Sequence, residues 1–172
     1  KPLPPSQIID TLRQIGFKPP FDTLLALRGI STRDEAYHFL NPSLQLLHNP
    51  FLMKGMQQAI DRIQKAIAAQ ERILIYGDYD VDGTSAVSLM YRYFSKHTPH
   101  LLTYIPDRYT EGYGVSFQGI DYAAAQGCNL IIALDCGIKA VDKVAYATQK
   151  GIDFIIADHH RPSDDIPDAV AV

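Results

Sequence analysis

From Met56 onward, the chain alternates between two hydrophobic patterns: short continuous apolar runs, and segments in which apolar residues recur every three or four positions. Met56 and the isoleucines that follow it at steps of four, three and four residues predict a helix with one buried face. A short β-rich run at 72–76 comes next, then a polar stretch and a second helical pattern that ends near Phe94. The order then recurs, with strands predicted near 101–105, 130–134 and 154–157 and helices near 117–126 and after 141.

This alternation is typical of a mostly parallel β-sheet with helices on both faces, because the strands are apolar throughout. We therefore predict an α/β domain over residues 56–172. Residues 1–55 follow a different pattern, with a helix that Ser6 is expected to cap and a capping-box-like spacing of Ser31 and Asp34. We interpret them as a short helical N-terminal extension.

Acidic residues and histidines gather in the loops that follow the predicted strands. Asp80, Asp107, Asp135 and His159 mark four such loops, spaced by 24 to 28 residues, or about one strand-plus-helix unit. Ligands of open parallel sheets bind beyond the carboxyl ends of the strands. The spacing therefore predicts that the four loops converge on one crevice.

The first loop has the sequence GDYDVDG, with Asp78, Asp80 and Asp82 inside five residues. Three neighbouring carboxylates repel one another unless something compensates their charge, and divalent cations do so well. The alternative is a solvated turn in which Asp78 or Asp82 caps the next helix. An EF-hand is excluded because its twelfth position is Leu89, and a phosphate-binding P-loop is excluded because the lysine it requires is missing.

Two later loops add further candidate ligands. Asp135 follows an apolar strand, where it is either a helix cap or a ligand, and Asp158, His159 and His160 follow the strand at 154–157. Carboxylates combined with imidazole suit Mn²⁺ better than Mg²⁺ and also tolerate Zn²⁺ or Fe²⁺. These ligands outnumber the needs of one ion, and a pair of ions about 3.5 to 4 Å apart is the arrangement that catalyses in-line displacement at phosphorus. Phosphoester hydrolysis is the chemistry this pattern favours.

The loop between 105 and 116 supplies candidate substrate contacts. Arg108 can pair with phosphate, and Tyr113 can stack on a base. The alternative is a surface loop hinged at its glycines.

A competing interpretation comes from the run Asp80-Val81-Asp82-Gly83-Thr84, which resembles the nucleophile motif of haloacid-dehalogenase-like phosphatases. That family needs a later acidic pair after an apolar strand. The only later pair, Asp164-Asp165, lies in a proline-flanked loop, and this interpretation leaves Asp158, His159 and His160 without a role.

GDYDVDG, the EGYG loop, LDCGI and DHH occur in this order, and together they resemble the DHH phosphoesterase family from about Leu27 to the end of the chain. Within that family the chain specifically resembles single-strand-specific 5′ to 3′ DNA exonucleases. The resemblance implies an enzyme with two divalent ions, Mn²⁺ favoured and Mg²⁺ possible, that acts on single-stranded DNA in repair and recombination alongside other repair proteins. It also implies residue roles: metal binding by Asp80, Asp82, Asp135 and His159, with Asp135 as the bridge, support from Asp78 and Asp158, and contact of His160 with the scissile phosphate.

Two alternatives to this function stay open. One is a DHH phosphodiesterase acting on oligoribonucleotides or cyclic dinucleotides, and the other is a non-catalytic metal- or nucleotide-binding sensor or scaffold. The family places a further metal-binding Asp and a substrate-gripping domain beyond the region that ends here at Val172, and the chain begins without Met. We therefore expect a part of a longer protein, which need not be active alone.

Composition narrows the class of protein. The net charge is −3, so the chain is not a basic-patch nucleic-acid binder. Two cysteines form no disulfide framework and suit the cytoplasm, and no apolar run approaches the ~18 residues of a membrane helix.

Overall fold

The computed structural model describes residues 4–172. The chain divides into two compact units, one ending at Asn49 and the other spanning Pro50–Val172. The division predicted after residue 55 falls directly before α4 (Met56–Ala68) and remains a prediction.

The first unit contains α1 (Ser6–Gln14), α2 (Phe21–Leu27), α3 (Arg33–Leu40) and the 3₁₀ turn η1 (Leu44–Leu46). Its small core consists of Leu12, Leu25, Ala26, Ile30 and Ala36. The predicted helical extension is therefore confirmed.

Two details of this unit differ from the predictions. Ser6 is the first helical residue of α1 and not its cap, which is Pro5. The capping box is formed by Thr32 and Glu35, whose side chains each accept a hydrogen bond from the other's backbone amide, and not by Ser31 and Asp34.

The second unit is built on four parallel strands, β1 (Arg72–Gly77), β2 (Leu101–Tyr104), β3 (Cys128–Leu134) and β4 (Asp153–Ala157), in the spatial order β2-β1-β3-β4. The predicted parallel sheet is confirmed. Residues 169–172 contribute one parallel bridge, between Ala171 and Ile155.

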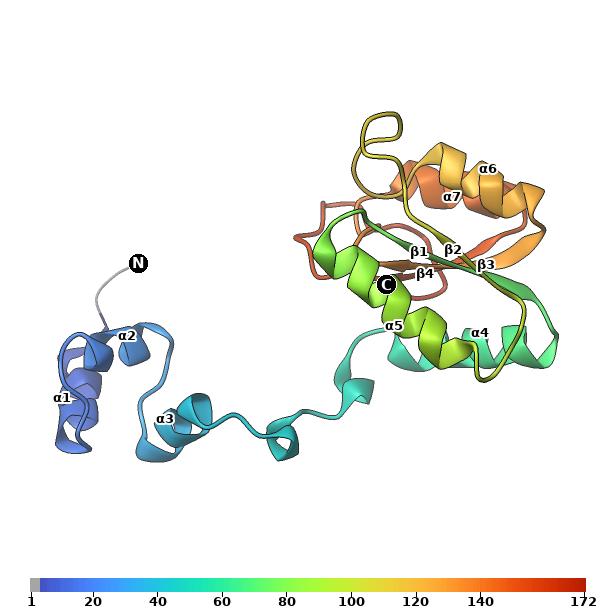
Figure 1. Cartoon of the computed structure of the whole chain (residues 1–172). Coiled ribbons are helices and arrows are strands. Elements are labelled where there is room, and N and C mark those ends of the chain that lie inside the picture. Colours follow the sequence, from blue (N-terminus) through green and yellow to red (C-terminus); the bar gives the residue numbers. More distant parts are fainter. Residues whose placement is uncertain (1–3) are drawn as a thin grey trace. The chain divides into compact units, whose positions relative to one another are not determined.

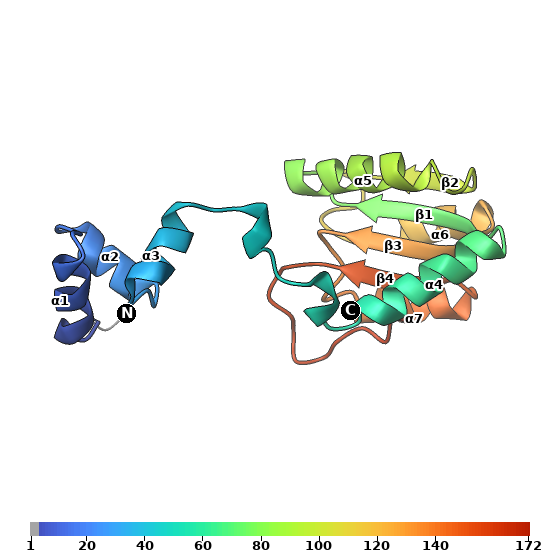
Figure 2. The same ribbon diagram turned by 90° about the horizontal axis from the view of Figure 1, so that it is seen from below.

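Helices cover both faces of this sheet, as Figures 1 and 2 show. On one face α4 and α5 (Val81–Phe94) pack against Ile73, Ile75 and Ile132. On the other, α6 (Phe117–Ala125) and α7 (Val141–Gln149) pack against Leu74 and Ile131. Alternate residues of each central strand thus enter opposite cores, which explains why these strands are apolar without interruption. The turn η2 (Pro50–Leu52) precedes α4.

The strand order creates a switch point, because β2 lies on one side of β1 and β3 on the other. Gly77, the last residue of β1, is in register with Leu134, the last residue of β3. The loops that begin with Asp78 and Asp135 therefore start side by side, at the place where such sheets bind ligands. Within residues 4–172, no helix is both long enough and apolar enough to span a bilayer.

Candidate metal centre

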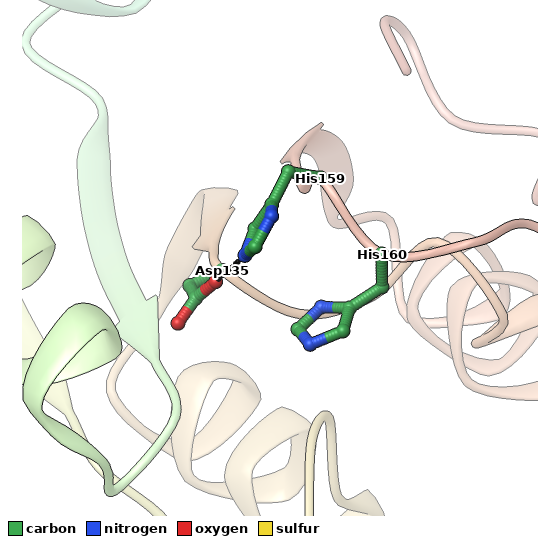
Figure 3. Close-up of side chains that lie close together, drawn as sticks. All are labelled: Asp135, His159 and His160. Atoms are coloured by element: carbon green, nitrogen blue, oxygen red, sulfur yellow. Dashed lines mark ion pairs between the residues drawn. The ribbon is translucent and has the colours of Figure 1, made fainter. Parts of the chain in front are cut away.

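The carboxyl ends of β3 and β4 bring an aspartate and a histidine into contact. The Nε2 atom of His159 lies 3.0 Å from Oδ1 of Asp135, as Figure 3 shows. One ligand atom each from Asp135, His159 and His160 lie within 4.8 Å of one another. Asp135 is 9% exposed, whereas both histidines are open to solvent.

Asp135 is held in an unusual backbone conformation. Its φ is +59°, in the left-handed region that non-glycine residues seldom adopt. Its amide donates to the carbonyl of Ala157 at 2.9 Å, which ties the end of β3 to β4. Burial raises the pKa of Asp135, as does the negative charge of Asp80, while the two histidines act to lower it. A non-glycine residue strained at a ligand-binding edge is a common mark of a functional site.

Asp80 and Asp82 approach Asp135 from the start of α5. Asp80 is the N-cap of this helix, and its Oδ1 accepts a hydrogen bond from the Gly83 amide at 2.9 Å. The helix cap is therefore Asp80, and the alternative with Asp78 or Asp82 as the cap is wrong. Asp82 lines a hollow of about 720 Å³ together with Asp135 and His159. The negative charges of Asp80 and Asp82 both act to raise the pKa of Asp135.

Asp78 is fully buried. Its Oδ1 accepts a hydrogen bond from the Gly114 amide at 3.1 Å, whereas Oδ2 has no partner within residues 4–172. A Cβ on Gly83 would lie 2.4 Å from the carbonyl oxygen of Asp78, so only glycine allows α5 to begin this close to the loop. Asp78 joins the aspartate loop to the loop between β2 and α6.

Asp158 orients His160. Its Oδ2 accepts from the Ile138 amide at 3.0 Å, and its Oδ1 lies 2.7 Å from Nδ1 of His160. Burial acts to raise the pKa of Asp158, but these hydrogen bonds outweigh it and the pKa is lowered. Nε2 of His160 lies 3.1 Å from the hydroxyl of Tyr113. Burial and the surrounding carboxylates, Asp78 first among them, raise the pKa of Tyr113 to about 12, so its hydroxyl stays protonated at neutral pH.

Tyr113 also lies against a second tyrosine, which follows Asp78. The rings of Tyr79 and Tyr113 meet edge to face at 6.1 Å, and the guanidinium of Arg108 lies 5.2 Å from the centre of the Tyr79 ring. Sequence reasoning missed Tyr79, although its place between two aspartates of GDYDVDG was an available signal. Asp107 lies outside this group, because its carboxylate accepts hydrogen bonds from the amides of Tyr109 and Thr110 in its own loop.

The donor set fits divalent cations. Asp82, Asp135 and His159 line one hollow, and the negative charge of Asp80 acts on the Asp135 carboxylate as well. A buried carboxylate oxygen of Asp78 without a partner in the described chain adds to this uncompensated charge. Hard oxygen donors with one imidazole are a set that Mn²⁺ and Mg²⁺ accept.

Comparison with protein families yields a match over residues 72–172 to the DHH family, N-terminal domain. The chain belongs to the DHH family. This decides between that family and the haloacid-dehalogenase-like alternative, and it confirms the predicted resemblance.

Among curated proteins, this DHH chain is 42% identical over 159 residues to the single-stranded-DNA-specific exonuclease RecJ of Bacillus subtilis, covering 92% of the chain and 20% of that protein. It is 31% identical over 155 residues to RecJ of Haemophilus influenzae, covering 90% of the chain and 26% of that protein. The chain thus spans about a fifth to a quarter of the length of these relatives.

Two solved structures share the fold of this DHH chain. An exonuclease RecJ bound to manganese superposes with a TM-score of 0.64 at 28% identity, covering 69% of this chain and 30% of the other. RecJ of Thermus thermophilus in complex with Mn²⁺ gives a TM-score of 0.69 at 23% identity over 98% of this chain and 23% of the other. The predicted α/β fold with its helical extension is confirmed by these similarities.

Proposed function

We propose that this protein is a metal-dependent exonuclease that hydrolyses phosphodiester bonds of single-stranded DNA from the 5′ end and acts in DNA repair and recombination. The supporting observation is the gathering of carboxylates and imidazoles from three loops at the β1–β3 switch point. The similarity to RecJ exonucleases supports the choice of single-stranded DNA as the substrate.

Four residues would hold the ions: Asp80, Asp82, Asp135 and His159. Asp135 is the proposed bridge, which is supported by its 3.0 Å contact with His159 and by the effect of the Asp80 charge on its pKa. Mn²⁺ is favoured and Mg²⁺ possible, in keeping with the manganese in the similar RecJ structure. When bound, such ions supply a water nucleophile at neutral pH and neutralise charge on the phosphoryl oxygens.

The remaining residues position the substrate. Asp158 holds the His160 ring at the edge of the site, where it would contact the scissile phosphate in place of the Tyr113 hydroxyl. Asp78 keeps the Tyr113 loop against the aspartate loop through its bond to Gly114. Arg108 and Tyr113 would take a phosphate and a base of a single strand, since tyrosine rings stack on unpaired bases.

The test uses the intact protein with Mn²⁺ and 5′-labelled single-stranded DNA. Asp80→Ala and Asp135→Ala should each lower activity at least about a hundredfold, since each removes a metal ligand that the chemistry needs. Asp165→Ala, in the exposed loop after β4, serves as the matched control and should leave the rate unchanged. Equal activity in all three variants would refute the assignment.

Competition experiments separate the alternatives. Oligoribonucleotides and cyclic dinucleotides should compete poorly with single-stranded DNA, and strong inhibition by either would favour a different DHH phosphodiesterase. Calorimetric binding of Mn²⁺ with no turnover of any of these substrates would favour the sensor or scaffold. Two buried free cysteines are consistent with a reducing compartment, and we propose a cytoplasmic location.

A further inference from the structure

The parallel sheet has a free edge at β2. In the order β2-β1-β3-β4, strand β2 pairs with β1 alone, and Figure 2 shows it at the margin of the sheet. Within residues 4–172, no other strand pairs with β2. A hollow of about 530 Å³ follows this edge, with lining residues from α5, β2 and α6.

The main chain of β2 presents alternate residues to its two sides. The Ile73 amide donates to the carbonyl of His100 at 2.9 Å, and Ile73 is in register with Leu101. In a parallel ladder with this register, the main-chain groups of residues 100, 102 and 104 point toward β1, and those of residues 101, 103 and 105 point away from it. The free edge therefore offers amides and carbonyls to a further strand, and such an edge is a template for pairing.

The side chains along this edge do not oppose pairing. Residues 101–105 have the sequence LLTYI, which contains no charged residue, whereas many natural edge strands are blocked by charge. Pro99 and Pro106 stand on either side of this segment and have no amide to donate. Pairing is therefore confined to residues 101–105.

The edge is complementary to a second copy of itself. If two β2 strands lie antiparallel with Thr103 opposite Thr103, Leu101 of each copy lies opposite Ile105 of the other. All three outward-facing positions then pair in the hydrogen-bonded arrangement, and apolar residues meet apolar residues. A two-fold axis at Thr103 makes the contact isologous, so it closes with two copies and leaves neither edge free.

Charged residues at the two ends of the edge match in the same arrangement. Lys96 precedes β2, and Asp107 follows it. With Thr103 on the axis, Asp107 of one copy lies opposite Pro99 of the other, three residues after Lys96 in the sequence. The antiparallel arrangement therefore brings the acidic end of each edge to the basic end of the other.

Both of these charged groups are available for such a contact. Hydrogen bonds, led by that from the Thr110 amide, lower the pKa of the exposed Asp107, so its carboxylate is charged at neutral pH. In the part of the chain that the structure describes, neither Lys96 nor Asp107 forms an ion pair. Arg108, the nearest cation in the sequence, lies over the Tyr79 ring.

We propose that this protein forms a two-fold dimer in which the β2 edges of two copies pair antiparallel and join the two sheets into one. The metal centre lies at the carboxyl ends of β1, β3 and β4, so the contact does not depend on the proposed nuclease function. A contact along five residues is small beside the ~1,200–2,000 Å² that stable interfaces bury. We therefore expect reversible dimerisation that depends on protein concentration.

Analytical ultracentrifugation of the intact protein, over an about hundredfold range of concentration, measures the association. The wild-type mass should double as the concentration rises. Thr103→Lys places two ammonium groups opposite each other at the axis, and the exposed position lets the chain fold, so the dimer should weaken at least about tenfold. Thr148→Lys adds the same charge at an exposed position on α7 and should dimerise like the wild type.

Cross-linking tests the register of the pairing. Opposed residues of a hydrogen-bonded antiparallel pair have Cα atoms about 5.5 Å apart, which a disulfide can bridge. Both native cysteines are buried. Oxidation by copper phenanthroline in air should therefore link Thr103→Cys into a covalent dimer that a thiol reductant reverses, whereas Thr148→Cys, the matched control, should stay unlinked.

The outcomes separate the possible occupants of the edge. A dimer that Thr103→Lys weakens and Thr103→Cys cross-links supports the proposal. A monomer at every concentration, or a dimer that Thr103→Lys leaves unchanged, would overturn it. Slow hydrogen exchange of the Thr103 amide in a monomer would show that another segment of the intact protein covers the edge, and this result would overturn the proposal as well.

Discussion

The hydroxyl of Tyr76 links the sheet to the loop that carries Gly114 and Ser116. Replacing Tyr76 with Phe tests that link. The side chain is fully buried, and its oxygen accepts a hydrogen bond from the Ser116 amide at 3.1 Å while it donates to the Gly114 carbonyl at 2.9 Å. Tyr76→Phe keeps the ring and removes both bonds. Two buried main-chain groups then lose their partner in a loop that also carries Tyr113.

Each buried polar group left unsatisfied costs about 1–3 kcal/mol, and local relaxation recovers part of that cost. We therefore expect Tyr76→Phe to lower the free energy of unfolding by about 2–4 kcal/mol. With a urea m-value of about 2 kcal/mol/M, the unfolding midpoint should fall by about 1–2 M. Circular dichroism during urea titration measures this change.

Tyr146→Phe is the matched control. It removes the bond from the Tyr146 hydroxyl to exposed Asp121, at 2.8 Å, on the surface of the same unit. The expected loss is below about 0.5 kcal/mol. If both variants lose the same small amount, the Tyr76 hydroxyl does not hold the loop and the reasoning is refuted.

Three further predictions concern residues that hold the loops and strands around the site. Gly83→Ala places a Cβ 2.4 Å from the carbonyl oxygen of Asp78. We therefore expect the free energy of unfolding to fall by about 1–3 kcal/mol and calorimetry to show weaker Mn²⁺ binding. The control variant Ser85→Ala, on the same helix, should change neither quantity. The pKa of Glu111 lies below its usual value of 4.5. Burial acts to raise this pKa, but the hydrogen bonds to the carboxylate, of which that from Ser116 is the strongest, lower it by more. Its folded-state pKa is depressed, so its stabilisation is present above pH 4.5 and is lost as the pH falls below that value. Glu111→Gln should therefore flatten the acid limb of a plot of unfolding free energy against pH, and an unchanged limb would contradict this. Arg62, 9% exposed, pairs with Glu71 at 2.7 Å. Arg62→Met should cost about 2 kcal/mol in urea unfolding, because it strands this carboxylate in a largely buried place, and a neutral result would contradict the role of the pair.

The order of strands and helices follows from the sequence because each element has a strong local pattern. The near-continuous apolar run of β3 predicts burial on both faces, and it enters both cores. The convergence of Asp80 and Asp135 also follows, since Gly77 and Leu134 end in register and the next residues share one edge.

Other features depend on contacts that no local pattern contains. Helix α2 has only seven residues, and an ion pair at 2.6 Å between the buried Asp22 and the half-exposed Arg13 of α1 anchors it. The approach of Tyr113 to His160 depends on how its loop folds back on the sheet, which is decided by the tertiary bonds of Gly114 to Tyr76 and Asp78. For the capping box, Ser31 and Thr32 are both hydroxyl residues, so spacing alone did not select between them.

The left-handed backbone at Asp135 sets folding against chemistry at a single residue. Glycine would occupy this conformation without strain and would also remove a carboxylate that its acidic neighbours repel. A selection for thermal tolerance alone should therefore replace this aspartate readily, and a selection for turnover should restore it. If the most heat-resistant variants carry a substitution at this residue and have lost activity, stability and activity conflict most strongly at the end of β3.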